Sequence, residues 1–232
     1  MKTQKILFSV ACAVIITLSF TSCKKNIDKR DCKISVLAGI SANDTFLYSS
    51  EGKISSVFSG LNRINYSYSD NKVTGTAFDA TGAFSYRTIA TLNAAALITN
   101  LKTEYDVSGT RWANIVYEYN GEELSQSTTT SSTGGNPTIT TYRWLNHNIV
   151  SETTGANTTS WSFYTDKPRK DGDYLWLLKI NYGGDILRTA NLLKSSGATN
   201  FSYEFDSDGK LSSMTFSDSG SSQTISYEYT CN

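Results

Sequence analysis

The sequence predicts an all-β fold, an antiparallel meander that is either barrel-like or a curled open sheet. Ser and Thr together number 61 and aromatic residues number 28, a composition typical of strands. Several segments alternate aromatic and polar residues and end in a turn signal such as Asp-Gly. We therefore expect roughly eleven to fourteen strands joined mostly by tight turns, with at most one or two short helices.

The segment FSYEFDSDGKLSSMTF, residues 201–216, is the clearest predicted hairpin. A two-residue turn at its Asp-Gly pair would place Phe201 opposite Phe216 and Tyr203 opposite Met214. One face would then be aromatic and the other largely polar, whereas a shift of one residue would scatter the apolar side chains over both faces. The pattern predicts a hairpin with one buried face.

Helix signals are few. Residues 185–197 have Asp185 as a candidate N-cap, an apolar pattern and Gly197 as a candidate stop, so we expect a short helix there. Residues 91–105 are compatible with either a helix or a strand, because their propensity favours the first and their neighbours favour the second.

The N-terminus is typical of a secretory signal. Lys2 and Lys5 precede an apolar run at 6–20, which is too short for a good membrane-spanning helix. Cys23 stands where a bacterial lipoprotein signal places its acylated cysteine, so we predict a signal peptide over 1–22 and a lipid on Cys23. The alternative is an ordinary cleaved signal that leaves Cys23 unmodified.

Residues 23–31 are predicted to be a lipidated tether and 32–232 a single β-meander domain. Residues 1–22 contain two lysines and no acidic residue, so the rest of the chain has a formal charge of −2. This charge gives no support to nucleic-acid binding, which needs a basic surface. Lys24 and Lys25 follow the lipidated cysteine directly.

Cys32 and Cys231 remain once Cys12 leaves with the signal and Cys23 is acylated. They lie at the two ends of the predicted domain, and disulfides persist in exported proteins. If the first and last strands are neighbours, a bridge between them would stabilise the fold by at most about 4–5 kcal/mol in chain-entropy models. Two free thiols are the alternative.

Short motifs give a family resemblance. YEFDSDGKL at 203–211 resembles YD repeats, and LYSSEGKI at 47–54 is a poorer copy. Together with the leader and the closing SYEYTC at 226–231, these hairpins resemble a family of exported lipoproteins from Gram-negative gut anaerobes with a porin-like domain of unknown function. The resemblance implies an all-β meander and brings no catalytic residues with it.

Residues for catalysis are scarce. His147 is the only histidine, and its place in LNHNI is typical of an exposed hairpin tip. No metal site and no cofactor are predicted, because the sequence has no CxxC pair and no glycine-rich phosphate loop. A glycosidase needs two facing carboxylates, and sequence spacing selects no pair among the candidates, which are Asp106, Glu118, Glu123, Asp166, Asp171, Asp173 and Glu204.

The tryptophans are the better functional lead. Trp112, Trp144, Trp161 and Trp176 are candidates for a platform on which sugar rings or extended peptides stack. The alternative is that the same rings fill the core face of the sheet. Trp144 and Trp161 flank polar, turn-like segments and are the best candidates for an exposed pair.

We therefore expect a non-catalytic, outer-membrane-anchored lipoprotein of the cell envelope that binds a glycan or peptide on an aromatic surface. The alternative is a structural partner that docks another envelope protein through a sheet edge, and a carboxylate-dependent glycosidase is a third reading. Lys24 and Lys25 favour a periplasm-facing anchor over the cell surface, because surface export in the phylum that this chain resembles is associated with acidic residues after the cysteine.

Overall fold

The computed structural model describes residues 31–39 and 43–231. The predicted signal peptide and the predicted lipidated cysteine lie outside the described residues. The fold described below is that of the unit that begins at Cys32.

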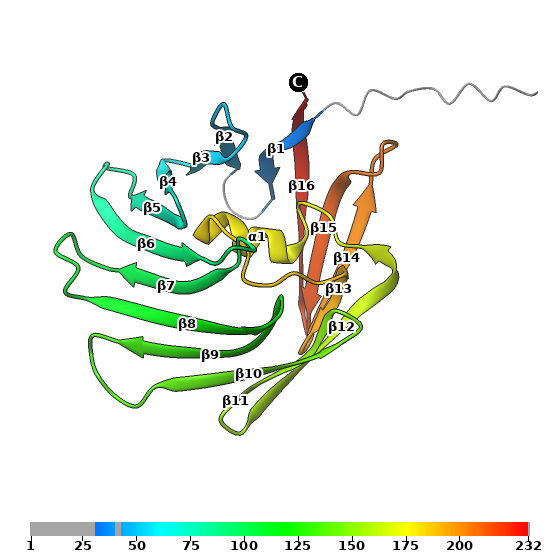
Figure 1. Ribbon diagram of the computed structural model, residues 1–232. Helices are drawn as coiled ribbons and strands as arrows, with labels where there is room; N and C mark the ends of the chain where they lie inside the picture. The colour runs from blue at the N-terminus through cyan, green and yellow to red at the C-terminus, as the bar shows by residue number, and fades with distance from the viewer. Residues whose placement is uncertain (1–30, 40–42, 232) are drawn as a thin grey trace, which may run out of the picture. The chain divides into compact units, whose positions relative to one another are not determined.

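Sixteen strands of the described part form one antiparallel meander, which closes into a barrel where β1 pairs with β16 (Figure 1). They are β1 Cys32–Ala38, β2 Asp44–Tyr48, β3 Ile54–Ser59, β4 Asn62–Ser69, β5 Lys72–Phe78, β6 Phe84–Leu92, β7 Ile98–Glu104, β8 Trp112–Asn120, β9 Glu123–Ser131, β10 Thr138–Leu145, β11 Asn148–Thr154, β12 Asn157–Pro168, β13 Asn191–Ser196, β14 Thr199–Phe205, β15 Leu211–Asp218 and β16 Ser221–Cys231. The predicted all-β meander is confirmed and closes as a barrel, but the predicted number of strands was too low.

The 201–216 hairpin has the two predicted aromatic pairings. Its turn, however, is longer than the predicted two residues: the Asp206 N–H donates to the Lys210 carbonyl over 2.9 Å, and the Gly209 N–H donates to the Asp206 carbonyl over 3.0 Å. Gly209 has φ +76°, a left-handed conformation that glycine adopts without a steric penalty. The extra turn residue is absorbed by a bulge next to Phe205, so the register farther along the strands is preserved.

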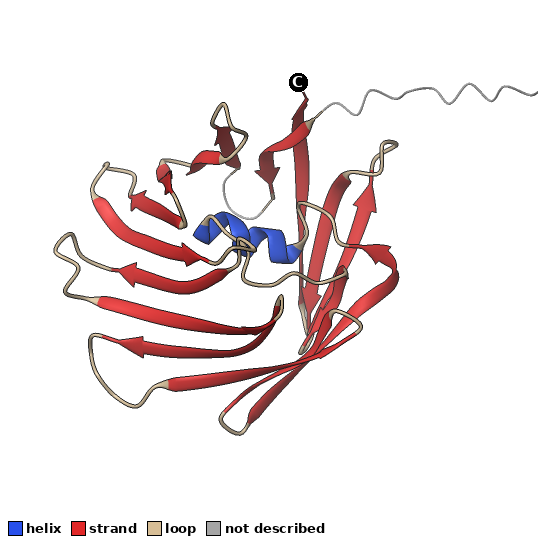
Figure 2. Cartoon of the chain, viewed as in Figure 1, coloured by secondary structure: helices blue, strands red, loops and turns tan. Residues whose placement is uncertain are grey.

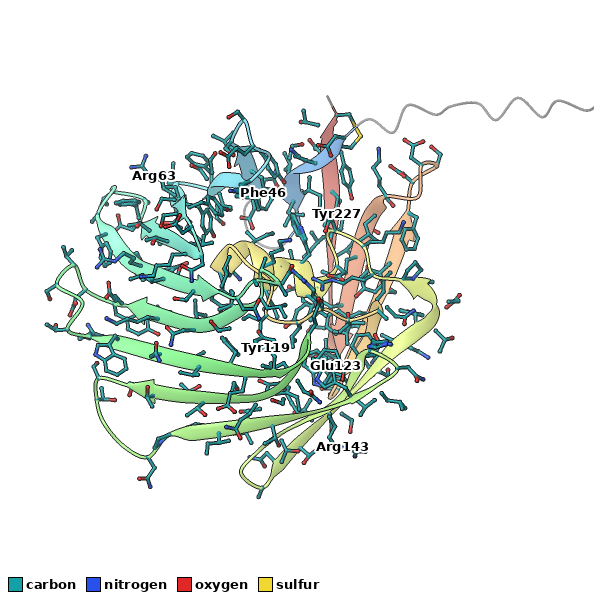
Figure 3. All side chains as sticks on the ribbon, in the orientation of Figure 1. Phe46, Arg63, Tyr119, Glu123, Arg143 and Tyr227 are labelled. Carbon is teal, nitrogen blue, oxygen red and sulfur yellow. A yellow bond between two sulfur atoms is a disulfide. The ribbon has the colours of Figure 1, made fainter. Side chains whose placement is uncertain are left out.

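In β14–β16, apolar side chains line the inside of the barrel and polar ones the outside. In β14–β16 the inward side chains are Phe201, Tyr203, Met214, Ile225 and Tyr227. The outward side chains of the same strands are Ser202, Glu204, Ser213, Thr215, Thr224, Ser226 and Glu228. Figure 3 shows Phe46 and Tyr227 directed into the barrel and Arg63 directed away from it. Successive side chains of a strand point to opposite faces, so this alternation fixes which face is inside.

The one helix of the described residues, α1 (Tyr174–Tyr182), connects β12 to β13 and lies inside the barrel (Figure 2). Its sequence YLWLLKINY is mostly apolar; Leu175, Trp176 and Ile180 are buried, while Asn181 is exposed. Asp173 caps its N-terminus, and Gly183, with φ +71°, ends it. Neither α1 nor any other segment of the described residues is a helix long and apolar enough to cross a membrane.

The helix predicted over 185–197 is wrong. Residues 185–190 are a loop and 191–196 form β13. Asp185 caps no helix there; its backbone carbonyl accepts a hydrogen bond of 2.9 Å from the Ile98 N–H, and its carboxylate faces Arg169 at 3.4 Å. Residues 91–105, left open between helix and strand, form the end of β6, a turn and β7.

The two ends of the barrel differ. We call the end where β1 begins and β16 finishes the helix end, because α1 enters there. The hydroxyl of Tyr227, on β16, donates to the Gly172 carbonyl just before α1, and that of Tyr66, on β4, donates to the Ile180 carbonyl within it. The opposite end, which carries the β9–β10 and β11–β12 turns, is called the far end. The helix thus crosses the barrel near one end only.

Cys32 and Cys231 face each other where the barrel closes, also at the helix end. Their Cα atoms are 4.0 Å apart, and a disulfide of 2.05 Å joins the sulfur atoms. The same bond is visible beside the C-terminus in Figure 3. The bridge links the first residue of the barrel to its last strand.

Candidate functional site

Polar side chains line the inner wall of β9–β12 between α1 and the far end. We call this set the lumen patch; its members are Ser127, Thr140, Tyr142, Glu152, Thr154, Thr159 and Trp161. All except Ser127 are half-buried although they point into the barrel. Because an inward side chain is exposed only where solvent enters the barrel, water reaches this part of the lumen.

A β-bulge creates the patch. Trp144 pairs with Ile149, but the next pair is Arg143 with Ser151, so Val150 is an extra residue on β11. The bulge reverses the faces that follow it and turns Glu152 inward, opposite the neighbouring β10 residue Tyr142. Bulges often re-aim a side chain in this way.

Hydrogen bonds hold the hydroxyl groups of the patch. Tyr142 Oη lies 3.2 Å from Ser127 Oγ, and Thr140 Oγ1 lies 2.6 Å from Thr154 Oγ1. The indole N–H of Trp161 is buried, makes no hydrogen bond of standard geometry within the described residues, and interacts with the Glu152 carboxyl group. A ligand acceptor at this position would add a well-aligned hydrogen bond to it.

Glu152 is the only charged member of the patch. Burial raises the pKa of its carboxyl group, and the Trp161 indole N–H lowers that pKa by a smaller amount. No ion pair of its carboxylate occurs within the described residues, and the N–H that interacts with it, that of Trp161, is neutral. The carboxylate therefore lies between two aromatic side chains without a compensating cation.

Many inward tyrosines are fixed by the backbone. Their hydroxyls donate to main-chain carbonyls over 2.7–2.9 Å in the pairs Tyr48–Ile34, Tyr68–Ile54, Tyr119–Ile98, Tyr164–Phe201 and Tyr229–Leu211. Tyr86, Tyr117 and Tyr182 make no such bond within the described residues. Burial raises the pKa of Tyr117, and the nearby phenols of Tyr182 and Tyr142 raise it further. The Tyr117 hydroxyl therefore lies in the neighbourhood of Tyr142 in the lumen patch.

A second polar cluster surrounds the start of α1. Asp173 is completely buried, and its Oδ1 accepts a hydrogen bond of 2.7 Å from the Trp176 N–H. Burial raises the pKa of Asp173 to about 6, while Arg169, with its Nε 3.6 Å from Oδ2, opposes the increase. Tyr203, whose buried hydroxyl has no hydrogen-bond partner within the described residues, is also near this carboxylate. The cluster supports the helix and is distant in the fold from the solvent-exposed far end.

A depression of about 670 Å³ lies at the rim of the helix end. It is lined by Asn120, Gly121, Glu122, Glu123, His147, Arg188, Thr189 and Ala190. His147 occupies a two-residue turn, as expected for a hairpin tip; its side chain is 82% exposed, and its Nδ1 lies 3.0 Å from Glu123 Oε1. Arg188 pairs with Glu122 at 3.3 Å. The charged groups of this rim are already paired with one another.

The four tryptophans do not form one platform. Trp112 lies on the outer face of β8, while Trp176 is on α1 and only 6% exposed, because Phe46 and its neighbours cover it. Trp144 and Trp161 both lie on the inner wall, and the Trp144 indole N–H donates to the Leu124 carbonyl over 2.7 Å. Of the four rings, Trp161 is the one that belongs to the lumen patch, where its N–H interacts with the Glu152 carboxyl group.

The carboxylates considered for a glycosidase are dispersed. Glu118 and Glu204 point outward, and Asp106 accepts hydrogen bonds from Thr110 and Arg111 in its own turn. Glu152, the carboxylate that does face the lumen, was missed, because nothing in the sequence marks the bulge at Val150. No group of three or more His, Cys, Asp or Glu side chains that could hold a metal ion occurs in residues 31–39 and 43–231.

No protein-family model matches the chain, and no curated protein matches it in sequence. Among solved structures, a porin-like protein from Bacteroides uniformis is similar in fold, with a TM-score of 0.59 and 17% sequence identity over 85% of this chain and 98% of that chain. A porin-like protein from Bacteroides vulgatus has a TM-score of 0.42 and 11% identity over the same shares. The first comparison agrees with the porin-like, all-β fold that the sequence motifs implied. The fold is therefore a porin-like barrel.

Proposed function

We propose that this protein is a non-catalytic binding domain of the cell envelope that holds an extended glycan in the far half of its barrel. The observation that carries the proposal is the lumen patch: half-buried hydroxyls, the Tyr142 ring and the Trp161 ring share one inner wall. Aromatic rings stack on the apolar faces of sugars, and hydroxyl side chains exchange hydrogen bonds with sugar hydroxyls. This chemistry fits a glycan better than a peptide.

The N-terminal leader supports the location. A lipid on Cys23 would hold the barrel to the outer membrane without a spanning segment, and Lys24 and Lys25 favour the periplasmic face. Intact-mass measurement of the membrane-extracted protein tests this part directly. A thioether-linked lipid on Cys23 supports it, and an unmodified Cys23 or a different first residue contradicts it.

The outer wall supports a barrel that is surrounded by water. Membrane-spanning barrels carry an apolar outer band about 25 Å tall, whereas the outward positions of β14–β16 here are Ser, Thr and Glu. Large exposed apolar side chains on strand faces, such as Leu47 and Ile139, are scattered over different strands. We propose that only the lipid enters the membrane.

The alternative of docking through a sheet edge is not retained. Every strand of the described barrel, from β1 to β16, has a hydrogen-bonded neighbour on both sides. A closed sheet has no terminal strand whose whole edge is open to a partner strand.

A titration of the full chain, extracted in detergent, with glycan oligomers tests the binding function. The double variant Trp144→Ala/Trp161→Ala should lose binding, and Trp112→Ala, which alters an outward ring, should retain it. Equal loss in both proteins, or binding unaffected by the inner-wall change, contradicts a site in the lumen.

A further inference from the structure

Glu152 gives the lumen patch a charge preference. The register places it opposite Tyr142 on one side and opposite Thr159 on the other, so the three side chains share the inner face. Trp161, two residues beyond Thr159 on the same face, also influences its carboxylate. The acid is thus surrounded by two rings and hydroxyl groups on the wall where we propose that the glycan binds.

The patch itself supplies no positive charge. It contains no Lys or Arg, and the Glu152 carboxylate makes no ion pair within the described residues; the group that interacts with it is the neutral N–H of Trp161. This contrasts with Glu104, a carboxylate on the outer face that is bonded by both Arg87 and Lys102. The barrel thus gives Glu104 two cations and leaves Glu152, in the lumen, without one within the described residues.

A positively charged group on the ligand would neutralise the charge of the Glu152 carboxylate. A half-buried carboxylate bonds more strongly to an ammonium group than to a neutral hydroxyl. The faces of Tyr142 and Trp161 attract cations as well. A neutral sugar would exchange hydrogen bonds with the hydroxyls and the Trp161 N–H, but it would leave the negative charge of the Glu152 carboxylate without a cation.

We infer that the lumen patch selects glycans that carry a free amino group, with the ammonium held by Glu152 and the sugar ring held against Trp161 and Tyr142. The inference rests on the proposed glycan-binding function and names its ligand class, an unacetylated amino sugar. The acetylated sugar lacks the positive charge and has a larger substituent at the same position.

A series of matched ligands tests the selection. Calorimetric titrations of the full chain, at physiological ionic strength to screen long-range attraction, would compare β-linked oligomers of glucose, N-acetylglucosamine and glucosamine. The glucosamine oligomer should bind about 10–100-fold more tightly than the other two, the range expected for a hydrogen bond to a charged group. This comparison needs no variant, so a folding defect cannot obscure it.

A matched pair of variants locates the effect. Glu152→Gln should abolish the preference and bring the glucosamine oligomer to the affinity of the glucose oligomer. Glu118→Gln, which removes an exposed, outward carboxylate on β8, should retain the preference in full. Equal affinity for the three oligomers, or a preference that survives Glu152→Gln, overturns the inference and leaves the binding function standing. Failure of all three oligomers to bind overturns the binding function as well.

Discussion

Asp173 should make the barrel more stable as the pH falls from about 7 to about 5. Its pKa is raised from 3.8 to about 6 by burial at the start of α1. A raised pKa means that the folded protein binds the proton more tightly than the unfolded chain does. The stabilisation is therefore fully present below pH 3.8 and is lost as the pH rises through about 6.

The size of the effect follows from the same shift. Linkage gives about 3 kcal/mol between the two extremes and about 1.4 kcal/mol between pH 7 and pH 5. For a domain of this size that corresponds to an increase of about 3–6 °C in Tm. The groups that face Asp173 are Arg169, Asp171, Tyr203 and Tyr227. Burial raises the pKa of Tyr203 and of Tyr227, so both phenols stay neutral over this range.

Urea unfolding of the wild type and of Asp173→Asn at several pH values isolates this group. Asparagine remains a good N-cap, so the variant should be at least as stable as the wild type at pH 7 and should lose the gain at pH 5. Asp79→Asn is the control, because hydrogen bonds from Thr81 and Ala83 lower the pKa of Asp79 and its contribution declines only at more acidic pH. A difference between wild type and Asp173→Asn that stays constant from pH 7 to pH 5 would refute the reasoning.

Two further predictions concern the disulfide and a helix-ending glycine. Serine at both Cys32 and Cys231 should lower the free energy of unfolding by up to about 5 kcal/mol, because the bridge closes nearly the whole barrel. Urea midpoints that do not change with reductant would contradict this, and peptide mapping without reductant tests the bond itself. Gly183→Ala should lower Tm strongly, because φ is +71° and the new Cβ would lie 2.3 Å from Val73 Cγ1. Gly121→Ala, at φ +66° with open space around it, is the control, and an equal loss of Tm in both would show that backbone conformation alone sets the cost.

The sequence was sufficient to predict the hairpins whose inner face is apolar. Alternating aromatic and polar residues identified which face of a hairpin is buried, and the pairing of Phe201 with Phe216 followed from that pattern. Strands rich in Ser and Thr, such as β9, were harder to count, because an inner wall that is itself polar has no apolar alternation.

The helix was placed in the wrong segment for a related reason. The apolar side chains of YLWLLKINY are distributed around the helix, so it lacks the one-sided apolar period by which a helix is usually identified. Its end signals, Asp173 and Gly183, are present in the sequence. Residues 185–197 show the expected period but run along the barrel rim and then into β13.

The residues of the lumen patch could be identified only from the structure. A simple two-residue turn at His147 without a bulge would direct Glu152 to the outside, and only the extra residue Val150 turns it inward. Trp161 was identified from the sequence as a candidate, but its partner residues on β10 and β11 were not.

Fluorine NMR of the full chain with fluorinated tryptophan tests most directly whether the ligand enters the barrel. The four resonances, assigned by single Trp→Phe variants, report on the outer wall at Trp112, the inner wall at Trp144 and Trp161, and the core at Trp176. Addition of the tightest-binding oligosaccharide should shift the Trp161 resonance most and leave that of Trp112 unchanged. A shift at Trp112 with none at Trp161, or no shift at saturating ligand, would contradict a glycan site in the lumen.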